Sequence, residues 1–112
     1  MNLSDLKHPG ELEDLYAPVM ATIVQAKRLT SMEMFYRIEL PDGQELGHQP
    51  GQFVELSIFG VGEAPFSISS SPTSRGGFDL GVRRAGMLTD VLARLGEGSK
   101  VGIRGPFGNG ID

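Results

Sequence analysis

The sequence contains no cysteine. Without thiols the chain can form neither a disulfide nor a thiolate metal site, and it offers no cysteine nucleophile and no ligands for an iron–sulfur cluster. Its two histidines, His8 and His48, lie far apart in the sequence, so they lack the close spacing of paired metal ligands. We therefore predict no metal site in this chain.

An excess of positive charge is also missing, because ten Lys and Arg residues stand against fourteen Asp and Glu residues. The net charge of −4 and the pI of about 5.1 are the opposite of the basic surface that nucleic acids require. No hydrophobic run approaches the length of a membrane span. The N-terminus has acid where a secretion signal requires base, and no apolar stretch follows. The composition predicts a cytoplasmic protein that binds neither nucleic acid nor membranes.

The chain is short, with 112 residues against the roughly 150 of an average domain, so one domain is expected. With 39% hydrophobic residues and a mean hydropathy of −0.10 it can bury a core. Residues 1–16 show little periodicity, and we expect a lead-in segment there with a single helical turn. The domain itself is predicted to span residues 17–112.

Short apolar segments separated by glycine and proline make up this domain. Inside the segments apolar and polar residues alternate, as in Met34, Tyr36 and Ile38 against Arg37 and Glu39. A period of two is typical of β-strands. The sequence predicts six strands, at residues 17–29, 33–40, 53–59, 64–71, 77–84 and 100–104.

One segment, between Gly86 and Gly96, follows a helical period instead. Its apolar residues recur at the spacing of a single buried helix face, and the two glycines provide the start and the stop. Six strands and one short helix predict an all-β fold, an antiparallel barrel that is closed or nearly closed, with the helix capping an opening.

The start of this helix is a candidate phosphate site. A helix N-terminus exposes unpaired N–H groups and a partial positive charge, so the amides of residues 87–89 can hold a phosphate, and Gly86 lets it approach the backbone. Arg83 and Arg84 add positive charge beside it. Asp90 argues against the site because an acid there already complements the helix dipole. A helix that only packs on the core remains an alternative.

The segment from Pro65 to Pro72 is rich in serine and carries one aromatic residue, Phe66. Alternation places Phe66 on one face of the strand and Ser67 on the other. An aromatic face next to hydroxyl groups suits a flat ring that needs stacking and edge hydrogen bonds. A solvated strand face explains Ser69 and Ser71 equally well. No Gly-x-Ser-x-Gly elbow is present, so a serine nucleophile is not predicted.

Four motifs together resemble the flavin-binding barrel of the ferredoxin–NADP reductase superfamily over about residues 17–110. The serine-rich motif is most similar to the gamma subunits of cytoplasmic hydrogenases and sulfhydrogenases and to the B subunits of anaerobic sulfite reductases. The electron-transfer subunit of dihydroorotate dehydrogenase is a more distant likeness. In chain order the motifs are Pro50-Gly51-Gln52-Phe53, the segment 63–70, Gly86-Met87-Leu88-Thr89 and Gly105-Pro106-Phe107-Gly108.

The resemblance implies a six-stranded Greek-key barrel that binds FAD, with the isoalloxazine ring against the serine strand and the pyrophosphate at the helix start. It implies that Ser67 reaches the N5 edge of the flavin, which makes Ser67 the candidate catalytic residue. The cofactor-binding residues that it implies are Ala64, Pro65, Phe66, Ser67, Val82, Arg83, Gly86, Met87, Leu88 and Thr89.

Two of these residues depart from the family pattern Arg-x-Tyr-Ser/Thr. Ala64 replaces the arginine and Phe66 replaces the tyrosine, while Ser67 keeps the hydroxyl. Without the guanidinium a charged hydrogen bond of about 1.5–3 kcal/mol is lost. The diphosphate would then rest mainly on the backbone amides of the helix start.

The expected function follows from the resemblance: a flavin domain of an NAD(P)H-linked oxidoreductase, in which FAD passes electrons between a nicotinamide nucleotide and iron–sulfur centres. The expected partners are other subunits of a hydrogenase, a sulfite reductase or a related redox complex. The nucleotide domain and the [2Fe–2S] domain of the similar proteins do not follow, so the isolated 112 residues should be inactive with NAD(P)H. The alternatives are an FMN-binding barrel and a non-enzymatic β-barrel interaction module without cofactor.

Overall fold

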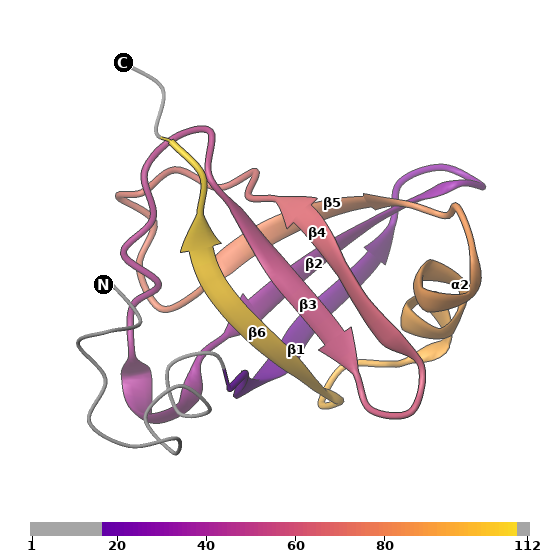
Figure 1. Cartoon of the computed structure of the whole chain (residues 1–112). Coiled ribbons are helices and arrows are strands. Elements are labelled where there is room, and N and C mark those ends of the chain that lie inside the picture. Colours follow the sequence, from indigo (N-terminus) through magenta and orange to yellow (C-terminus); the bar gives the residue numbers. More distant parts are fainter. Residues whose placement is uncertain (1–16, 110–112) are drawn as a thin grey trace.

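Six antiparallel strands and one helix form the computed structural model, which describes residues 17–109 (Figure 1). The lead-in segment expected at residues 1–16 lies outside the described residues. The chain also makes a short 3-10 turn at Pro41–Gly43. The elements are β1 (Val19–Arg28), β2 (Glu33–Glu39), β3 (Phe53–Ile58), β4 (Gly62–Ser67), β5 (Phe78–Arg83), α2 (Met87–Arg94) and β6 (Lys100–Phe107).

The strands make one curled sheet in the order β4-β3-β6-β1-β2-β5. Three of its ladders join strands that are not consecutive in the chain, β3 with β6, β6 with β1 and β2 with β5, which is Greek-key connectivity. The two edge strands, β4 and β5, approach each other and share a single bridge, Ile68 with Leu80. The expected all-β, six-stranded antiparallel architecture is confirmed, but the sheet is not closed by a ladder between β4 and β5.

The predicted bounds of two strands were wrong. The strand expected at 64–71 runs from Gly62 to Ser67, because after the bridge at Ile68 the chain turns away and the carbonyl of Ser70 is bonded by the His48 ring, 3.0 Å away. The strand expected at 100–104 continues to Phe107, because a bulge lets Phe107 pair with Phe53. Both differences depend on contacts distant in the sequence.

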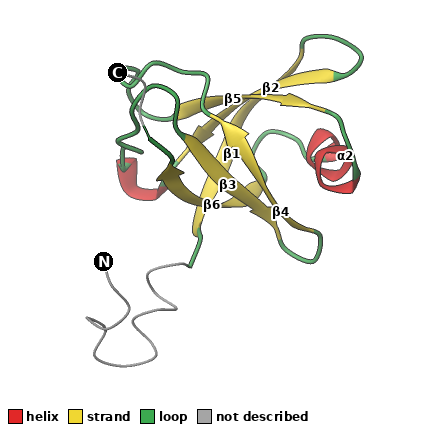
Figure 2. Ribbon diagram, turned by 45° about the horizontal axis from the view of Figure 1, so that its top comes forward, coloured by secondary structure: helices red, strands yellow, loops and turns green. Residues whose placement is uncertain are grey.

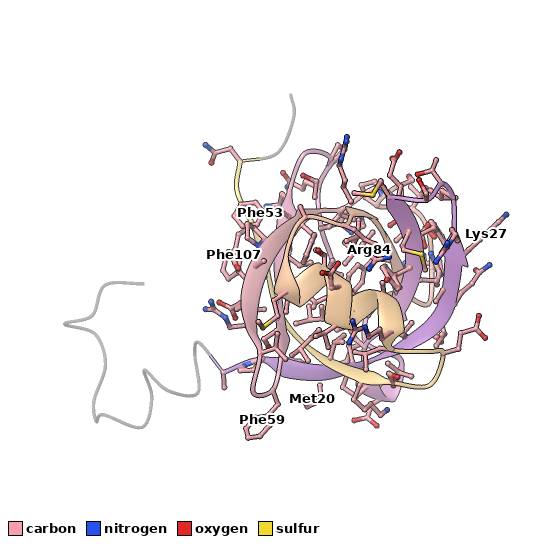
Figure 3. All side chains as sticks on the ribbon, turned by 90° about the vertical axis from the view of Figure 1, so that its right-hand side faces the viewer. Met20, Lys27, Phe53, Phe59, Arg84 and Phe107 are labelled. Carbon is pink, nitrogen blue, oxygen red and sulfur yellow. The ribbon has the colours of Figure 1, made fainter. Side chains whose placement is uncertain are left out.

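The core lies inside the curl of the sheet. Alternate residues of every strand except β4 contribute fully buried side chains to it, which is the pattern predicted by the period of two. Helix α2 adds the fully buried Leu92, and it lies across the open end of the barrel (Figure 3). In Figures 1 and 2 the helix stands beside β4. The predicted capping helix thus covers the end of the barrel next to this edge strand.

Within residues 17–109 no helix is long and apolar enough to cross a membrane. In the same range no group of three or more His, Cys, Asp or Glu side chains is arranged to hold a metal ion.

Candidate functional site

The register of the β3–β4 hairpin determines where β4, called here the serine strand, points the side chains of Pro65, Phe66 and Ser67. Phe66 pairs with the fully buried Val54, so it lies on the core face and packs there. Ser67 pairs with Phe53 on the outer face, and its hydroxyl has no hydrogen-bond partner within residues 17–109. The structure therefore separates the aromatic ring and the free hydroxyl to opposite faces, as the alternation predicts.

A hollow of about 330 Å³ lies at this end of the hairpin, lined by Phe53, Pro65, Phe66 and Ser67. Its size is at the lower limit of small-molecule sites, which begin at about 300 Å³. Three of the predicted site residues, at positions 65–67, are thus brought together in one cavity. Phe53 was not predicted as a site residue, although it stands at the end of the quoted Pro-Gly-Gln-Phe motif; only the strand register places it opposite Ser67.

Phe53 is part of an aromatic pair that joins two distant motifs. Its ring centroid lies 5.8 Å from that of Phe107, at an interplanar angle of 46°. The Gln52 amide group donates to the Gly108 carbonyl oxygen over 2.8 Å and ties the same two segments together. The backbone N–H of Ile68 donates to the Gln52 carbonyl oxygen over 3.1 Å. Three of the four motifs therefore meet at Gln52 and Phe53, and Phe53 lines the hollow.

An ion pair between Arg104 and Glu63 lies beside the aromatic pair of Phe53 and Phe107. The Arg104 guanidinium bonds both carboxylate oxygens of Glu63, at 2.9 and 2.5 Å, and its carbon lies 5.8 Å from the centroid of Phe107. Hydrogen bonding to Arg104 lowers the pKa of Glu63 below its ordinary value of 4.5. At neutral pH Glu63 is therefore ionised and holds Arg104 beside the aromatic pair.

The start of α2 leaves three backbone donors free. The first helical hydrogen bond runs from the N–H of Asp90 to the carbonyl of Gly86, 2.9 Å away, and no side chain caps the helix. The amides of Met87, Leu88 and Thr89 consequently have no acceptor within residues 17–109. The Thr89 hydroxyl is used elsewhere, accepting from the N–H of Ala85 at 2.7 Å and donating to the Gly86 carbonyl at 3.1 Å.

Gly86 has a backbone that favours glycine, with φ 144° and ψ −171°. A Cβ at this position would meet no atom within 4 Å. The space beside the Gly86 Cα is therefore open, and the glycine is required by the backbone conformation and not by crowding. Such an open start is what an anion needs to reach the amides.

The two arginines before the helix differ in their surroundings. Arg83 is exposed and has no ion-pair partner within residues 17–109. Arg84 donates from Nε to the Asp90 carboxylate over 3.1 Å, with about a third of its side chain exposed. Val82 is 3% exposed, so its side chain belongs to the core and only its backbone can face a ligand. Ala64 faces the core with Leu56, its partner in β3.

The two halves of the predicted site are carried by adjacent elements. Helix α2 packs beside β4, the strand of Pro65, Phe66 and Ser67. The free amides of α2 do not line the hollow itself, so the structure presents two separate features on neighbouring elements: an aromatic hollow with a hydroxyl, and a set of N–H donors.

Comparisons with known proteins agree on one family. The family model for the oxidoreductase FAD-binding domain matches residues 20–110. The sulfhydrogenase 1 gamma subunit of Pyrococcus furiosus is 44% identical over 99 residues, which cover 86% of this chain and 34% of that protein. A probable electron-transfer subunit of dihydroorotate dehydrogenase B from Methanocella arvoryzae is 36% identical over 93 residues, covering 83% of this chain and 33% of the relative. The chain thus spans about a third of the length of these relatives.

Solved structures show the same fold. The NADH-dependent reduced ferredoxin–NADP oxidoreductase, studied for flavin-based electron bifurcation, superposes with a TM-score of 0.72 at 25% identity, over 81% of this chain and 33% of that one. The cytochrome P450 reductase GcoB of Amycolatopsis gives a TM-score of 0.73 at 26% identity, over 81% of this chain and 28% of the other.

Proposed function

The chain belongs to the family of oxidoreductase FAD-binding domains, and from that premise we propose that FAD is held between the serine strand and the start of α2. In this arrangement the amides of Met87, Leu88 and Thr89 bind the diphosphate. Ser67 presents its hydroxyl to the N5 edge of the ring, and Phe66 flanks the ring. The three free amides at an open helix start, beside the strand of Ser67, are the observation that carries the proposal.

The residues present fit such a cofactor. The hollow supplies an aromatic wall and an unpartnered hydroxyl for a flat, partly polar ring. The helix start supplies donors without acceptors, and the open space in front of Gly86 admits a bulky anion. Ala64 provides no guanidinium, and Arg83, which is exposed and has no ion-pair partner within residues 17–109, supplies a cation for the diphosphate. The backbone of Val82 completes the set at the end of β5.

FAD, when bound, supplies the chemistry, exchanging a hydride with NAD(P)H and single electrons with iron–sulfur centres. The residues of this chain bind and orient it. We assign to Ser67 a hydrogen bond at the ring edge where the hydride arrives, and this contact adjusts the electron affinity of the ring. We place the nicotinamide and [2Fe–2S] sites outside these 112 residues, since a chain without cysteine has no thiolate ligands for a cluster.

We further propose that the domain works within a multisubunit redox complex. The supporting observation is that similar chains occur in a sulfhydrogenase gamma subunit and in electron-transfer subunits of dihydroorotate dehydrogenase B. A hydrogenase or an anaerobic sulfite reductase in the cytoplasm is the setting we propose. Because we place the nicotinamide site outside these 112 residues, we expect them alone not to turn over NAD(P)H.

A flavin titration tests the proposal. Added to the purified full chain, FAD should show a perturbed visible spectrum and altered fluorescence with saturation, and it should bind more tightly than FMN because it carries the second phosphate. Ser67→Ala should change the bound spectrum, whereas Ser31→Ala, an exposed serine in the β1–β2 turn, should not. A chain that gives neither a spectral change nor heat with either flavin would instead support the cofactor-free interaction module.

A further inference from the structure

The tip of the β3–β4 hairpin carries a fully exposed aromatic side chain. Phe59, in the turn after β3, has a relative exposure of 103%, and Met20 of β1 is 53% exposed. A single exposed apolar residue is ordinary on a protein surface, whereas several that adjoin one another mark a place where another segment or chain binds. The arrangement of these side chains therefore decides whether this end of the barrel is a binding surface.

Strand β6 brings the two residues close together. Met20 is in register with Gly102, and Gly102 is in register with Ser57, two residues before Phe59. Two strand spacings thus separate Met20 from Ser57, a distance of about 10 Å. Met20 alternates with the fully buried Ala21, so its side chain lies on the outer face of the sheet. Figure 3 shows Met20 and Phe59 at the same side of the barrel.

A third apolar residue, Pro18, lies between them. A Cβ added at Gly102 would be 2.3 Å from the Ser57 hydroxyl oxygen and 3.0 Å from the Pro18 Cβ. The proline therefore lies over the glycine of β6, where that strand has no side chain. We call Pro18, Met20 and Phe59 the tip patch. All three are exposed, so no residue within 17–109 covers the tip patch.

The chain itself enters the tip patch at Pro18, and sixteen residues precede Ala17 in the sequence. The leucines among them are Leu3, Leu6, Leu12 and Leu15. An extended chain spans at most about 3.3–3.6 Å per residue, so Leu15 can lie up to about 10 Å from Pro18 and Leu12 up to about 20 Å. Both leucines therefore reach the tip patch. A tethered segment also binds at a high effective concentration, an advantage that a separate partner lacks.

The charges on both sides agree with this occupant. The acidic residues among positions 11–16 are Glu11, Glu13 and Asp14, and no basic residue accompanies them. On the outer face of β6, Lys100 is exposed and has no ion-pair partner within residues 17–109, and its ammonium group donates to a hydroxyl of β1. Two acids lie on the same face of the sheet, but Arg104 bonds Glu63 and is in register with Glu55. Lys100 is thus available to the carboxylates of the segment.

We propose that residues 1–16 fold back on the barrel and bind the tip patch, with their leucines against Met20 and Phe59 and their carboxylates near Lys100. The segment thereby covers an apolar surface that would otherwise favour association between copies of this chain. The inference is independent of the flavin proposal, because the tip patch shares no residue with the proposed cofactor site.

A tryptophan at position 59 reports whether the tip patch is covered. The natural chain contains no tryptophan, so Phe59→Trp in the full chain gives a single tryptophan emission, whose maximum lies at shorter wavelength when the ring is shielded from water. Adding Leu12→Ser and Leu15→Ser together should move this maximum to longer wavelength and increase quenching by acrylamide. Leu29→Ser is the matched control. Leu29 is 53% exposed just beyond the far end of β1, and its replacement should leave the emission unchanged.

The charge contact is tested in the same Phe59→Trp chain. Lys100→Glu should also move the maximum to longer wavelength, because it places a carboxylate beside those of the segment. Lys27→Glu changes the net charge equally at an exposed position near the far end of β1, and it should have no effect. Equal emission from the two lysine variants would refute the contact with Lys100.

The remaining fluorescence outcomes would overturn the proposal. An emission maximum that stays at short wavelength in the double serine variant and depends on protein concentration would assign the tip patch to a second copy of this chain. A maximum typical of a fully exposed tryptophan, in the full chain with its leucines intact, would show that nothing covers the patch.

A disulfide measurement does not depend on the tryptophan. Because the chain has no cysteine, Leu12→Cys/Phe59→Cys carries two thiols only, and mild oxidation should join them within one molecule. Leu12→Cys/Leu29→Cys should react more slowly, because the ten residues of β1 place Leu29 about 30 Å from the tip patch. Equal rates for the two pairs, or disulfides formed between molecules, would contradict the proposal.

Discussion

At the scale of single residues, the serine strand is a set of side chains divided between two faces. Ala64 and Phe66 share the core face, where each pairs with a buried residue of β3, while Ser67 is free on the outer face. A phenol at position 66 would therefore have needed a polar partner near the core. Phenylalanine avoids this requirement.

Gly86 is the residue whose replacement should damage the proposed phosphate site most directly. Its φ of 144° lies in a region that other residues rarely adopt, so Gly86→Ala should lower the free energy of unfolding by about 1–3 kcal/mol. The altered backbone would also turn the amides of residues 87–89, and FAD affinity should fall. Chemical denaturation and a flavin titration on the same preparation measure the two effects.

A matched control is available at Gly60, in the turn between β3 and β4. It too has a positive φ, 80°, and a Cβ at this position would meet no atom within 4 Å, but it is not part of the helix start. Gly60→Ala should destabilise the fold without changing FAD affinity. If Gly86→Ala retained full affinity, the role of the helix start in binding phosphate would be refuted.

At the scale of elements, α2 depends on the core for its position. With eight residues it is too short to be stable alone, and the fully buried Leu92 fastens it to the barrel. Leu92→Ala should cost about 2–5 kcal/mol of unfolding free energy. Below the unfolding transition it should also speed hydrogen exchange of the α2 amides, which mass spectrometry can follow.

Met87, in the same helix, provides the comparison. Its side chain is 73% exposed, so Met87→Ala should change the unfolding free energy by no more than about 0.5 kcal/mol. Equal losses for Leu92→Ala and Met87→Ala would show that α2 is not held by its buried face.

The loop after β4 is a second element whose position comes from distant residues. Arg37 in β2 donates to Asp79 at 2.9 Å, to the Ser74 hydroxyl at 3.1 Å and to the Arg75 carbonyl at 2.7 Å. The loop is thereby attached to β2 and β5. These bonds fix the position of the loop that connects β4 to β5.

At the scale of the whole molecule, the proposed site lies where β4 and β5 do not close the sheet. Edge strands β4 and β5 share one bridge, and α2 covers the end of the barrel beside this opening (Figure 3). A ligand that contacts both β4 and the start of α2, which directly follows β5, connects the two edge strands, and these share only one bridge. Binding should therefore stabilise the fold as a unit.

This linkage can be measured in the intact chain. FAD at a hundred times its dissociation constant should raise the free energy of unfolding by about 2.7 kcal/mol, provided that only the folded chain binds it. Above the dissociation constant, the melting temperature should keep rising with the logarithm of the FAD concentration. A melting temperature independent of FAD over that range would contradict a site built between β4 and α2.

Much of this architecture could be predicted because it depends on the pattern of neighbouring residues in the sequence. Alternation located all six strands. The helical period predicted a helix between Gly86 and Gly96, and α2 spans Met87–Arg94. The sequence also shows directly that a hydroxyl stands at position 67 and that a glycine precedes the helix. The ends of β4 and β6 were not, since they are set by His48 and by pairing with Phe53.

The sequence by itself determined which segments form strands and which residues carry donors, because side-chain periodicity and residue chemistry are properties of neighbours in the chain. Only the tertiary structure decided that the rings of Phe53 and Phe107 pack against each other, and that the Tyr36 hydroxyl is buried without a hydrogen-bond partner within residues 17–109. The physical reason is strand register: which residues face each other across the sheet depends on how the whole barrel packs its core, and no local pattern contains that information.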